Sequence, residues 1–284
     1  MLRILNNYRF RRFKNRLFFG ICLACVIIAI VPLLSILFEV IARGASQINL
    51  HFLTSNVLQG GIGPAIQGTL IIIGLTSVIG IPIGILSGIY LAEYGDNKFA
   101  STMRVINNVL TQVPSVIIGI TAFGLIIIYV TGTYSPLAGA VALSFMMIPI
   151  VARTTEESLK LVPNSVREAS LALGVHKWRT LISVALAAAK SGLITGTLLG
   201  VARIAGETAP LLFTILGNSF FFQGFNAPMD ALPLRIFLNS RLDTAEAQAT
   251  AWGAALILIL IVLALNFGVR IASRGRNFRW KLFG

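Results

Sequence analysis

The sequence predicts an all-α polytopic membrane protein with six transmembrane helices. Of its 284 residues, 56% are apolar and 12% are charged, whereas a soluble globular protein carries about a quarter charged residues. The apolar residues form continuous runs of about 20, the length that a helix needs to cross a bilayer. Continuous runs also exclude a transmembrane β-barrel, whose strands alternate apolar and polar residues. Backbone amides in hydrocarbon must be bonded within their own segment, so each run is expected to be helical.

Six apolar segments are the predicted spans. The first, 17–40, is too long for the apolar region of a signal peptide and lacks a small-x-small cleavage pattern at its end, so we interpret it as a true span. The other five are 66–92, 105–130, 137–152, 191–216 and 251–271. The chain then divides into a basic N-terminus (1–16), a first helix (17–40), a five-helix core (66–273) that includes an inner loop (153–190), and a basic tail (274–284).

The distribution of basic residues predicts the orientation. With the N-terminus placed inside the cell, 19 of the 23 Lys and Arg residues fall on inner segments and three on outer loops. Basic residues accumulate on cytoplasmic loops, so we predict a multi-pass protein of a bacterial or archaeal plasma membrane with both termini cytoplasmic. The same rule explains the net charge of +13 without nucleic acid. No basic stretch is interleaved with aromatics as in a nucleic-acid-binding module.

The sequence gives little support for a metal or redox site. Cys22 and Cys25 form a C-x-x-C, but they lie inside the first apolar run, where two small apolar side chains are the simpler interpretation. With only His51 and His176 besides, no metal site is predicted. The spans also lack a His, Cys-His or paired-carboxylate set of the kind that an intramembrane enzyme needs.

The inner loop at 153–190 is long and patterned. Ser165 and Glu168 have the S-x-x-E spacing of a capping box, which predicts the start of a helix just after Pro163. Gly174 stands where a left-handed C-cap would end that helix, and a second helix is expected from His176 onward. Such a helix-turn-helix is either a docking surface for a partner or a segment packed on the protein's own helix ends.

Arg203 and Glu207 are the second polar feature. Arg203 lies 12 residues from one end of the predicted fifth span and 13 from the other, close to the membrane midplane. An arginine there costs about 2.5 to 3.5 kcal/mol, so it is expected to face the bundle interior or water. The i,i+4 spacing places both side chains on one helix face. The pair either lines an anion pathway, where a guanidinium binds oxyanions bidentately, or joins helices as a structural ion pair.

The inner loop resembles the EAA loop of ABC-importer permeases. That motif reads E-A-A, three residues, G, nine residues, I, one residue, L-P. The matching residues here are Glu168, Ala169, Ser170, Gly174, Val184, Leu186 and Ala187. Ser170, Val184 and Ala187 depart from it, while the spacing is kept. The resemblance implies that this loop couples the membrane helices to a cytoplasmic ATPase. The ATPase must be a separate subunit, because the chain has no Gly-Lys dipeptide with which to build a P-loop.

A second resemblance is narrower. The stretch 203–210, together with 60–70 and 113–116, is similar to the PstA-type permeases of phosphate-specific ABC importers. This implies a type I (MetI-like) permease architecture that translocates inorganic phosphate, with no cofactor and no catalysis in this chain. It also implies three partners: a related second permease in a heterodimer, an ATPase dimer, and an extracytoplasmic phosphate-binding protein. Arg203 and Glu207 would then line the substrate pathway.

Three alternatives remain at this point. A permease of the same architecture could carry another oxyanion, such as molybdate or sulfate. A self-contained ion channel would conduct without ATP and would not need the long inner loop. The third alternative is an intramembrane enzyme. The absence of a reactive set of side chains from the spans argues against it.

Overall fold

The computed structural model describes residues 2–275, and within them the chain is helical, with one isolated bridge between Leu216 and Met229 instead of a sheet. Five helices are long and apolar enough to cross a membrane, or six if the bent pair α4–α5 is counted as one span. The predicted all-α class is confirmed. The long helices are α1 (Leu2–Gly44), α3 (Gly63–Glu93), α6 (Pro136–Lys160), α9 (Leu186–Ala205) and α12 (Ala245–Gly275).

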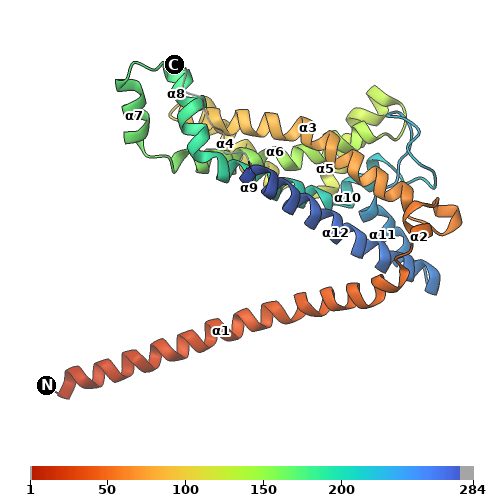
Figure 1. The fold of residues 1–284 in the computed structure, drawn as a ribbon, viewed down its shortest axis with the longest axis horizontal. Coiled ribbons are helices and arrows are strands. Elements are labelled where there is room, and N and C mark those ends of the chain that lie inside the picture. Colours follow the sequence, from red (N-terminus) through yellow and green to blue (C-terminus); the bar gives the residue numbers. More distant parts are fainter. Residues whose placement is uncertain (1, 276–284) are drawn as a thin grey trace.

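The core of the bundle is the packing of α6 against α3 on one side and α9 on the other (Figure 1). Small residues allow the close approach. A Cβ atom built on Gly84 of α3 would lie 2.7 Å from the Cβ of Val151 on α6. Gly80 of α3 and Gly200 of α9 both pack against Met147. This glycine-mediated contact is typical of membrane helices, which associate through close packing rather than through the hydrophobic effect.

Helix α1 contacts the bundle only near its C-terminal end, where it packs against α12. From there it diverges, so that it extends away from the other helices (Figure 1). The side chains between residues 10 and 38 are exposed, although nearly all of those from residue 17 onward are apolar. The predicted first span lies inside this helix. An unpartnered apolar helix of this length needs lipid or another subunit around it.

The third predicted span, 105–130, is wrong as a single straight helix. It is divided between α4 (Lys98–Gln112) and α5 (Ser115–Ala122), which meet at 101° and continue as a π-helix, Phe123–Thr131. Pro114 lies at the break, and a proline disfavours helical backbone at the residue before it. Val113 is accordingly extended, with ψ 127°. Apolar content alone does not reveal this bend.

The fifth predicted span, 191–216, is also wrong at both ends. The helix begins at Lys177, passes through α8 (Lys177–Thr180) and a π-helical turn (Leu181–Ala185), and ends with α9 at Ala205. The second helix expected in the inner loop and the fifth span are therefore one helix. A separate short helix, α10 (Ala209–Thr214), follows with Pro210 in its first turn. Pro210 suits a helix start, where its missing N–H is not needed.

The inner loop is shorter than predicted, because α6 continues to Lys160. It contains α7 (Asn164–Ala172), followed by the turn into α8. At the other end of the bundle, α2 (Leu50–Thr54) and α11 (Leu232–Ser240) close the structure around Phe52, Ile62 and Leu232. Most of the predicted basic tail, 276–284, lies outside the described residues.

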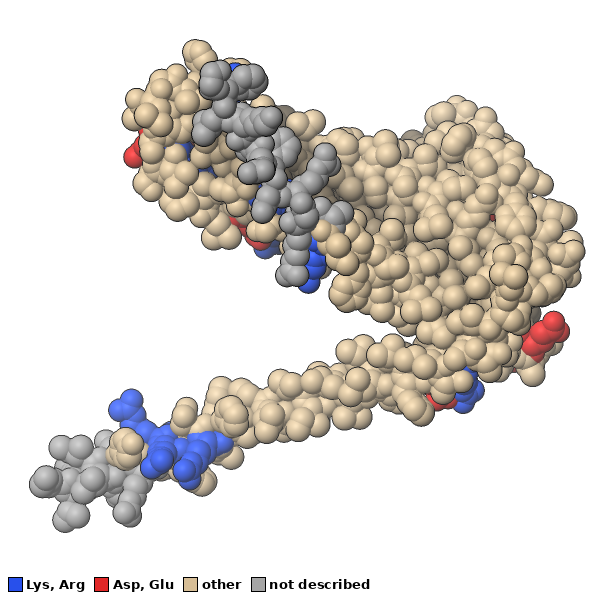
Figure 2. All heavy atoms as spheres, in the orientation of Figure 1, with Lys and Arg blue, Asp and Glu red and all other residues tan. Residues whose placement is uncertain are grey.

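Charged side chains gather near the ends of the helices, as Figure 2 shows on one face. Basic groups mark the N-terminal part of α1, and mixed charges lie near the end of the bundle that carries α7. Further charges lie at the opposite end of the molecule, and the band between the two ends is almost free of charge on this face. This distribution suits a protein surrounded by hydrocarbon at its middle.

Candidate functional site

Arg203 and Glu207 form an ion pair, with Nη1 of Arg203 2.7 Å from Oε1 of Glu207. Arg203 lies in the last turn of α9, and Glu207 follows the helix end, where its N–H donates to the carbonyl oxygen of Ile204. The sequence predicts this pairing on a continuous helix, whereas the structure forms it across a helix terminus. The Arg203 side chain is 58% exposed and that of Glu207 only 10%. The carboxylate thus holds the guanidinium at the surface of the chain.

The packing of neighbouring residues shows where this pair lies along the axis of the bundle. Gly200, three residues before Arg203, contacts Met147, which in turn contacts Gly80. Met147 and Gly80 lie close to the midpoints of α6 and α3. Arg203 is therefore near the middle of the bundle, although the span on which its predicted depth was based ends two residues later.

A groove leads away from Arg203 toward the end of the bundle that carries α7. It has a volume of about 330 Å³ and lies between α6 and α9. Its polar lining comes from both helices: Thr154, Glu157, Ser158, Ser191 and Thr195. Leu199, one helical turn before Arg203, closes its inner end. The groove thus runs from one helical turn short of Arg203 toward the end of the bundle that carries α7.

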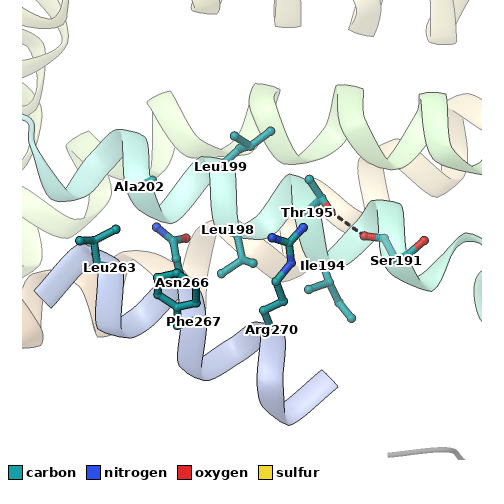
Figure 3. A pocket seen from close by; sticks show the side chains of 10 residues that line it. All are labelled: Ser191, Ile194, Thr195, Leu198, Leu199, Ala202, Leu263, Asn266, Phe267 and Arg270. Carbon is teal, nitrogen blue, oxygen red and sulfur yellow. Dashed lines mark hydrogen bonds between the residues drawn. The ribbon is translucent and has the colours of Figure 1, made fainter. Parts of the chain in front are cut away.

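A larger cavity of about 520 Å³ lies between α9 and α12 (Figure 3). Side chains of both helices project into it, most of them apolar, and Thr195 donates a hydrogen bond of 2.8 Å to the carbonyl oxygen of Ser191 at one edge. Neither Arg203 nor Glu207 lines it. Size alone therefore does not identify the candidate pathway, which we place where the charged pair lies.

The segment with the EAA spacing forms a compact turn. Gly174 has φ +79°, the left-handed conformation that was predicted for a C-cap. Ser170 is buried, and its hydroxyl lies 2.9 Å from that of Thr180, which joins α7 to α8. Glu168 and Ala169 are exposed on α7. The predicted capping box is wrong, because α7 begins at Asn164 with no side-chain cap.

Two partly buried ion-pair networks at this end were not predicted from the sequence. Arg104 of α4 donates from Nε to Glu156 (2.9 Å) and from its other two nitrogens to the carbonyl oxygens of Gly95 and Leu91. Arg167 of α7 pairs with Glu93 at the end of α3. The paired residues are 52 and 74 positions apart. No local spacing could indicate these contacts.

The opposite end of the structure also contains a buried pair outside the spans. Asp230 is fully buried, and Arg235 donates to its Oδ2 from Nε at 2.7 Å. Burial raises the pKa of Asp230, and the Arg235 charge only partly offsets this effect. Within the described chain, Oδ1 of Asp230 has no hydrogen-bond partner. The pair fixes the loop before α11, since Arg235 also donates to the carbonyl oxygen of Asn218.

Metal binding finds no support in the structure. Among residues 2–275, no group of three or more His, Cys, Asp and Glu side chains is placed to hold a metal ion. The two cysteines lie on the exposed surface of α1 as free thiols.

Comparison with known proteins identifies relatives over most of the chain. Residues 80–277 match the profile of the family described as "Binding-protein-dependent transport system inner membrane component". The phosphate transport system permease protein PstA of Yersinia pestis is 41% identical over 92% of this chain and 90% of its own length. The Haemophilus influenzae PstA is 41% identical over 93% of this chain and 96% of its own. A probable PstA of Methanocaldococcus jannaschii is 36% identical over 93% of this chain and 95% of its own length.

Solved structures support the fold. A structure of the MetNI methionine ABC transporter in an inward-facing conformation matches 80% of this chain and 99% of its own with a TM-score of 0.61 and 18% identity. A bacterial ABC transporter that imports alginate matches 93% of this chain and 97% of its own with a TM-score of 0.68 and 13% identity. The predicted MetI-like permease architecture is confirmed.

Proposed function

Because this chain belongs to the family of binding-protein-dependent transport system inner membrane components, we propose that it is the permease subunit of an ABC importer for inorganic phosphate. The single observation that carries this proposal is the Arg203–Glu207 pair at the middle of an apolar bundle. The relatives described as phosphate transport permeases support the choice of substrate. The chain performs no bond chemistry and needs no cofactor of its own.

Arg203 suits a phosphate pathway for two reasons. Its planar guanidinium matches two oxygens of a tetrahedral oxyanion at once, which the ammonium of lysine does not do. In a region of low dielectric it also offsets the charge of the anion. Glu207, held 2.7 Å away, supplies a carboxylate that accepts the proton that phosphate carries and sulfate lacks at neutral pH. The pair therefore favours a protonated oxyanion.

The exposure of Arg203 supports a second permease subunit. Its side chain is 58% exposed on this chain, and a charge at the middle of a bilayer is very unfavourable against lipid. Arg203 must then face a water-filled route or another protein surface. A related permease that closes the groove between α6 and α9 satisfies both conditions, and the two chains would form a heterodimer around the route.

The α7 end supports an ATPase partner. Apolar side chains are exposed there, including Leu171, Leu173 and Trp178, beside the exposed Glu168. A rim of apolar side chains of this kind indicates a protein interface. We place this end, and both termini, on the cytoplasmic side of a bacterial or archaeal plasma membrane. An extracytoplasmic phosphate-binding protein would then deliver substrate to the opposite end, which α2 and α11 close.

The test is phosphate uptake by the assembled importer in proteoliposomes. Uptake should require ATP, and Arg203→Ala and Arg203→Gln should each lower it about tenfold or more at equal assembly, because a charge-assisted contact to the anion is lost. Arg43→Gln is the matched control, since Arg43 is 60% exposed and pairs with Glu39 four residues away. Normal uptake in both Arg203 variants, or transport by this chain without nucleotide, would overturn the proposal. Stronger competition by molybdate or sulfate than by unlabelled phosphate would change the substrate.

A further inference from the structure

The arginines in the α7 half of the bundle differ in how their guanidinium groups are used. All three nitrogens of Arg104 donate to protein acceptors. Arg153 of α6 donates only from Nε, at 2.9 Å to Oε1 of Glu157. Within residues 2–275 its two terminal nitrogens have no hydrogen-bond partner, and the side chain is 66% exposed. Arg104 is thus a structural residue, whereas Arg153 keeps the planar edge that binds an oxyanion.

The depth of Arg153 makes this open edge unusual. It follows Met147, which lies near the middle of α6, by six residues. At 1.5 Å per residue it is therefore about 9 Å from the bundle midplane. The hydrocarbon half-thickness is about 15 Å, so Arg153 lies at hydrocarbon depth, whereas Glu157, ten residues from Met147, lies at the hydrocarbon boundary. An exposed ion pair at this depth is expected to face a polar route rather than lipid.

Two cavities place Arg153 on the same route as Arg203. Its partner Glu157 lines the groove between α6 and α9, which ends one turn before Arg203. Arg153 itself lines a second cavity of about 220 Å³, together with Asn107, Asn108 and Thr111 of α4. Two ion-paired carboxylates, Glu156 and Glu157, and the cations Arg104 and Lys160 also line this cavity. The side-chain amides of Asn107 and Asn108 add neutral hydrogen-bond donors beside the guanidinium, whereas the Thr111 hydroxyl already donates to the carbonyl oxygen of Asn108. Arg153 therefore lies between the groove and a polar vestibule on α4.

We propose that Arg153 forms a second oxyanion-binding station between Arg203 and the cytoplasm, an inference that rests on the proposed function. Along the helix axes it is roughly 13 Å from the level of Arg203. The anion would be bound by the two terminal nitrogens of Arg153, with Asn107 and Asn108 beside it. Glu157 keeps Nε occupied and offsets part of the charge, so that binding stays weak enough for release. Asn107, Asn108 and Arg153 are thus expected to influence the rate of release into the cell.

The station can be tested by protection of a cysteine. Asn108→Cys, in a chain with Cys22→Ala and Cys25→Ala, is modified in the assembled importer with a negatively charged methanethiosulfonate reagent. Inorganic phosphate is compared with chloride at equal ionic strength. We expect phosphate to slow the modification several-fold, and Arg153→Gln to abolish this protection. Arg43→Gln, which removes a similarly exposed and similarly paired arginine elsewhere, should leave the protection intact.

The outcomes separate the station from the proposed substrate. Equal modification with phosphate and with chloride would overturn the station, even if phosphate uptake is normal. Protection that persists in Arg153→Gln would overturn the role of this residue. Protection by molybdate but not by phosphate would support an oxyanion station while contradicting the proposed substrate. In uptake assays, Arg153→Gln should lower the maximal rate about tenfold and leave the KM for external phosphate unchanged, because a charge-assisted contact after the entry step is lost.

Discussion

Arg167 of α7 is paired with Glu93 at the end of α3, and its Nη2 donates to the carbonyl oxygen of Leu159 on α6 at 2.9 Å. One guanidinium therefore joins the short exposed helix to both of the helices at the centre of the bundle. Its side chain is 20% exposed and that of Glu93 is 10% exposed. We therefore expect a movement imposed on α7 to reach α3 and α6 through this contact.

Arg167→Ala is expected to uncouple ATP hydrolysis from transport. The substitution leaves Glu93, whose side chain is only 10% exposed, without its partner, and breaking a fully buried pair costs at most about 3 to 5 kcal/mol. The measurement is the amount of phosphate moved per ATP hydrolysed, together with thermal unfolding of the purified complex. Arg43→Ala, which removes an exposed arginine away from the α7 end, is the control. A charge reversal, Arg167→Glu with Glu93→Arg, should restore part of the coupling, and an unchanged ratio in Arg167→Ala would contradict this role.

Arg203→Lys should retain only a small part of the transport. Lysine keeps the positive charge but presents a point charge instead of a planar fork. We expect phosphate uptake between that of the wild type and that of Arg203→Gln, with discrimination against sulfate reduced. Parallel uptake measurements with labelled phosphate and sulfate check both quantities. Equal rates for Arg203→Lys and the wild type would show that charge alone is sufficient.

Gly84→Ala should destabilise the contact of α3 with α6, whereas Gly74→Ala should not. A Cβ at position 84 would meet the Cβ of Val151 at 2.7 Å, while position 74 has nothing within 4 Å. Overpacking of this kind typically costs about 1 to 3 kcal/mol. The two variants share one helix and one substitution, so their melting temperatures in the same detergent give a direct comparison. Similar melting temperatures would mean that the two helices can separate without cost.

The stability of the loop before α11 should depend on pH through Asp230. Burial raises the pKa of Asp230 above its ordinary value of 3.8, so the folded protein binds this proton more tightly than the unfolded chain. The resulting stabilisation is fully present below the ordinary pKa and is lost as the pH rises through the raised pKa. The double variant Asp230→Asn/Arg235→Gln lacks this titration. Its stability relative to the wild type should therefore improve from about pH 4 to pH 7 in thermal unfolding.

Local sequence features predicted the elements that depend on local chemistry. The apolar runs located α1, α3 and α12, because hydrocarbon requires long apolar helices wherever the chain crosses. Gly174 adopts the left-handed conformation expected of a C-cap glycine. Pro114 and Pro210 were visible in the sequence as well, and greater weight on them would have divided the third and fifth spans correctly.

Tertiary contacts determined the features that depend on residues far apart in the sequence. The sequence by itself determined the all-α membrane class, the Arg203–Glu207 spacing and the segment with the EAA pattern, since each is written in residues close together along the chain. Only the folded structure assigned each arginine its surroundings: Arg104 and Arg167 donate to acceptors outside their own helices, whereas Arg153 and Arg203 each pair with a carboxylate four residues away and stay more than half exposed. The physical reason is that a hydrogen-bond partner is chosen by proximity in space, and packing of α3, α6 and α9 brings together residues that are 50 or more positions apart.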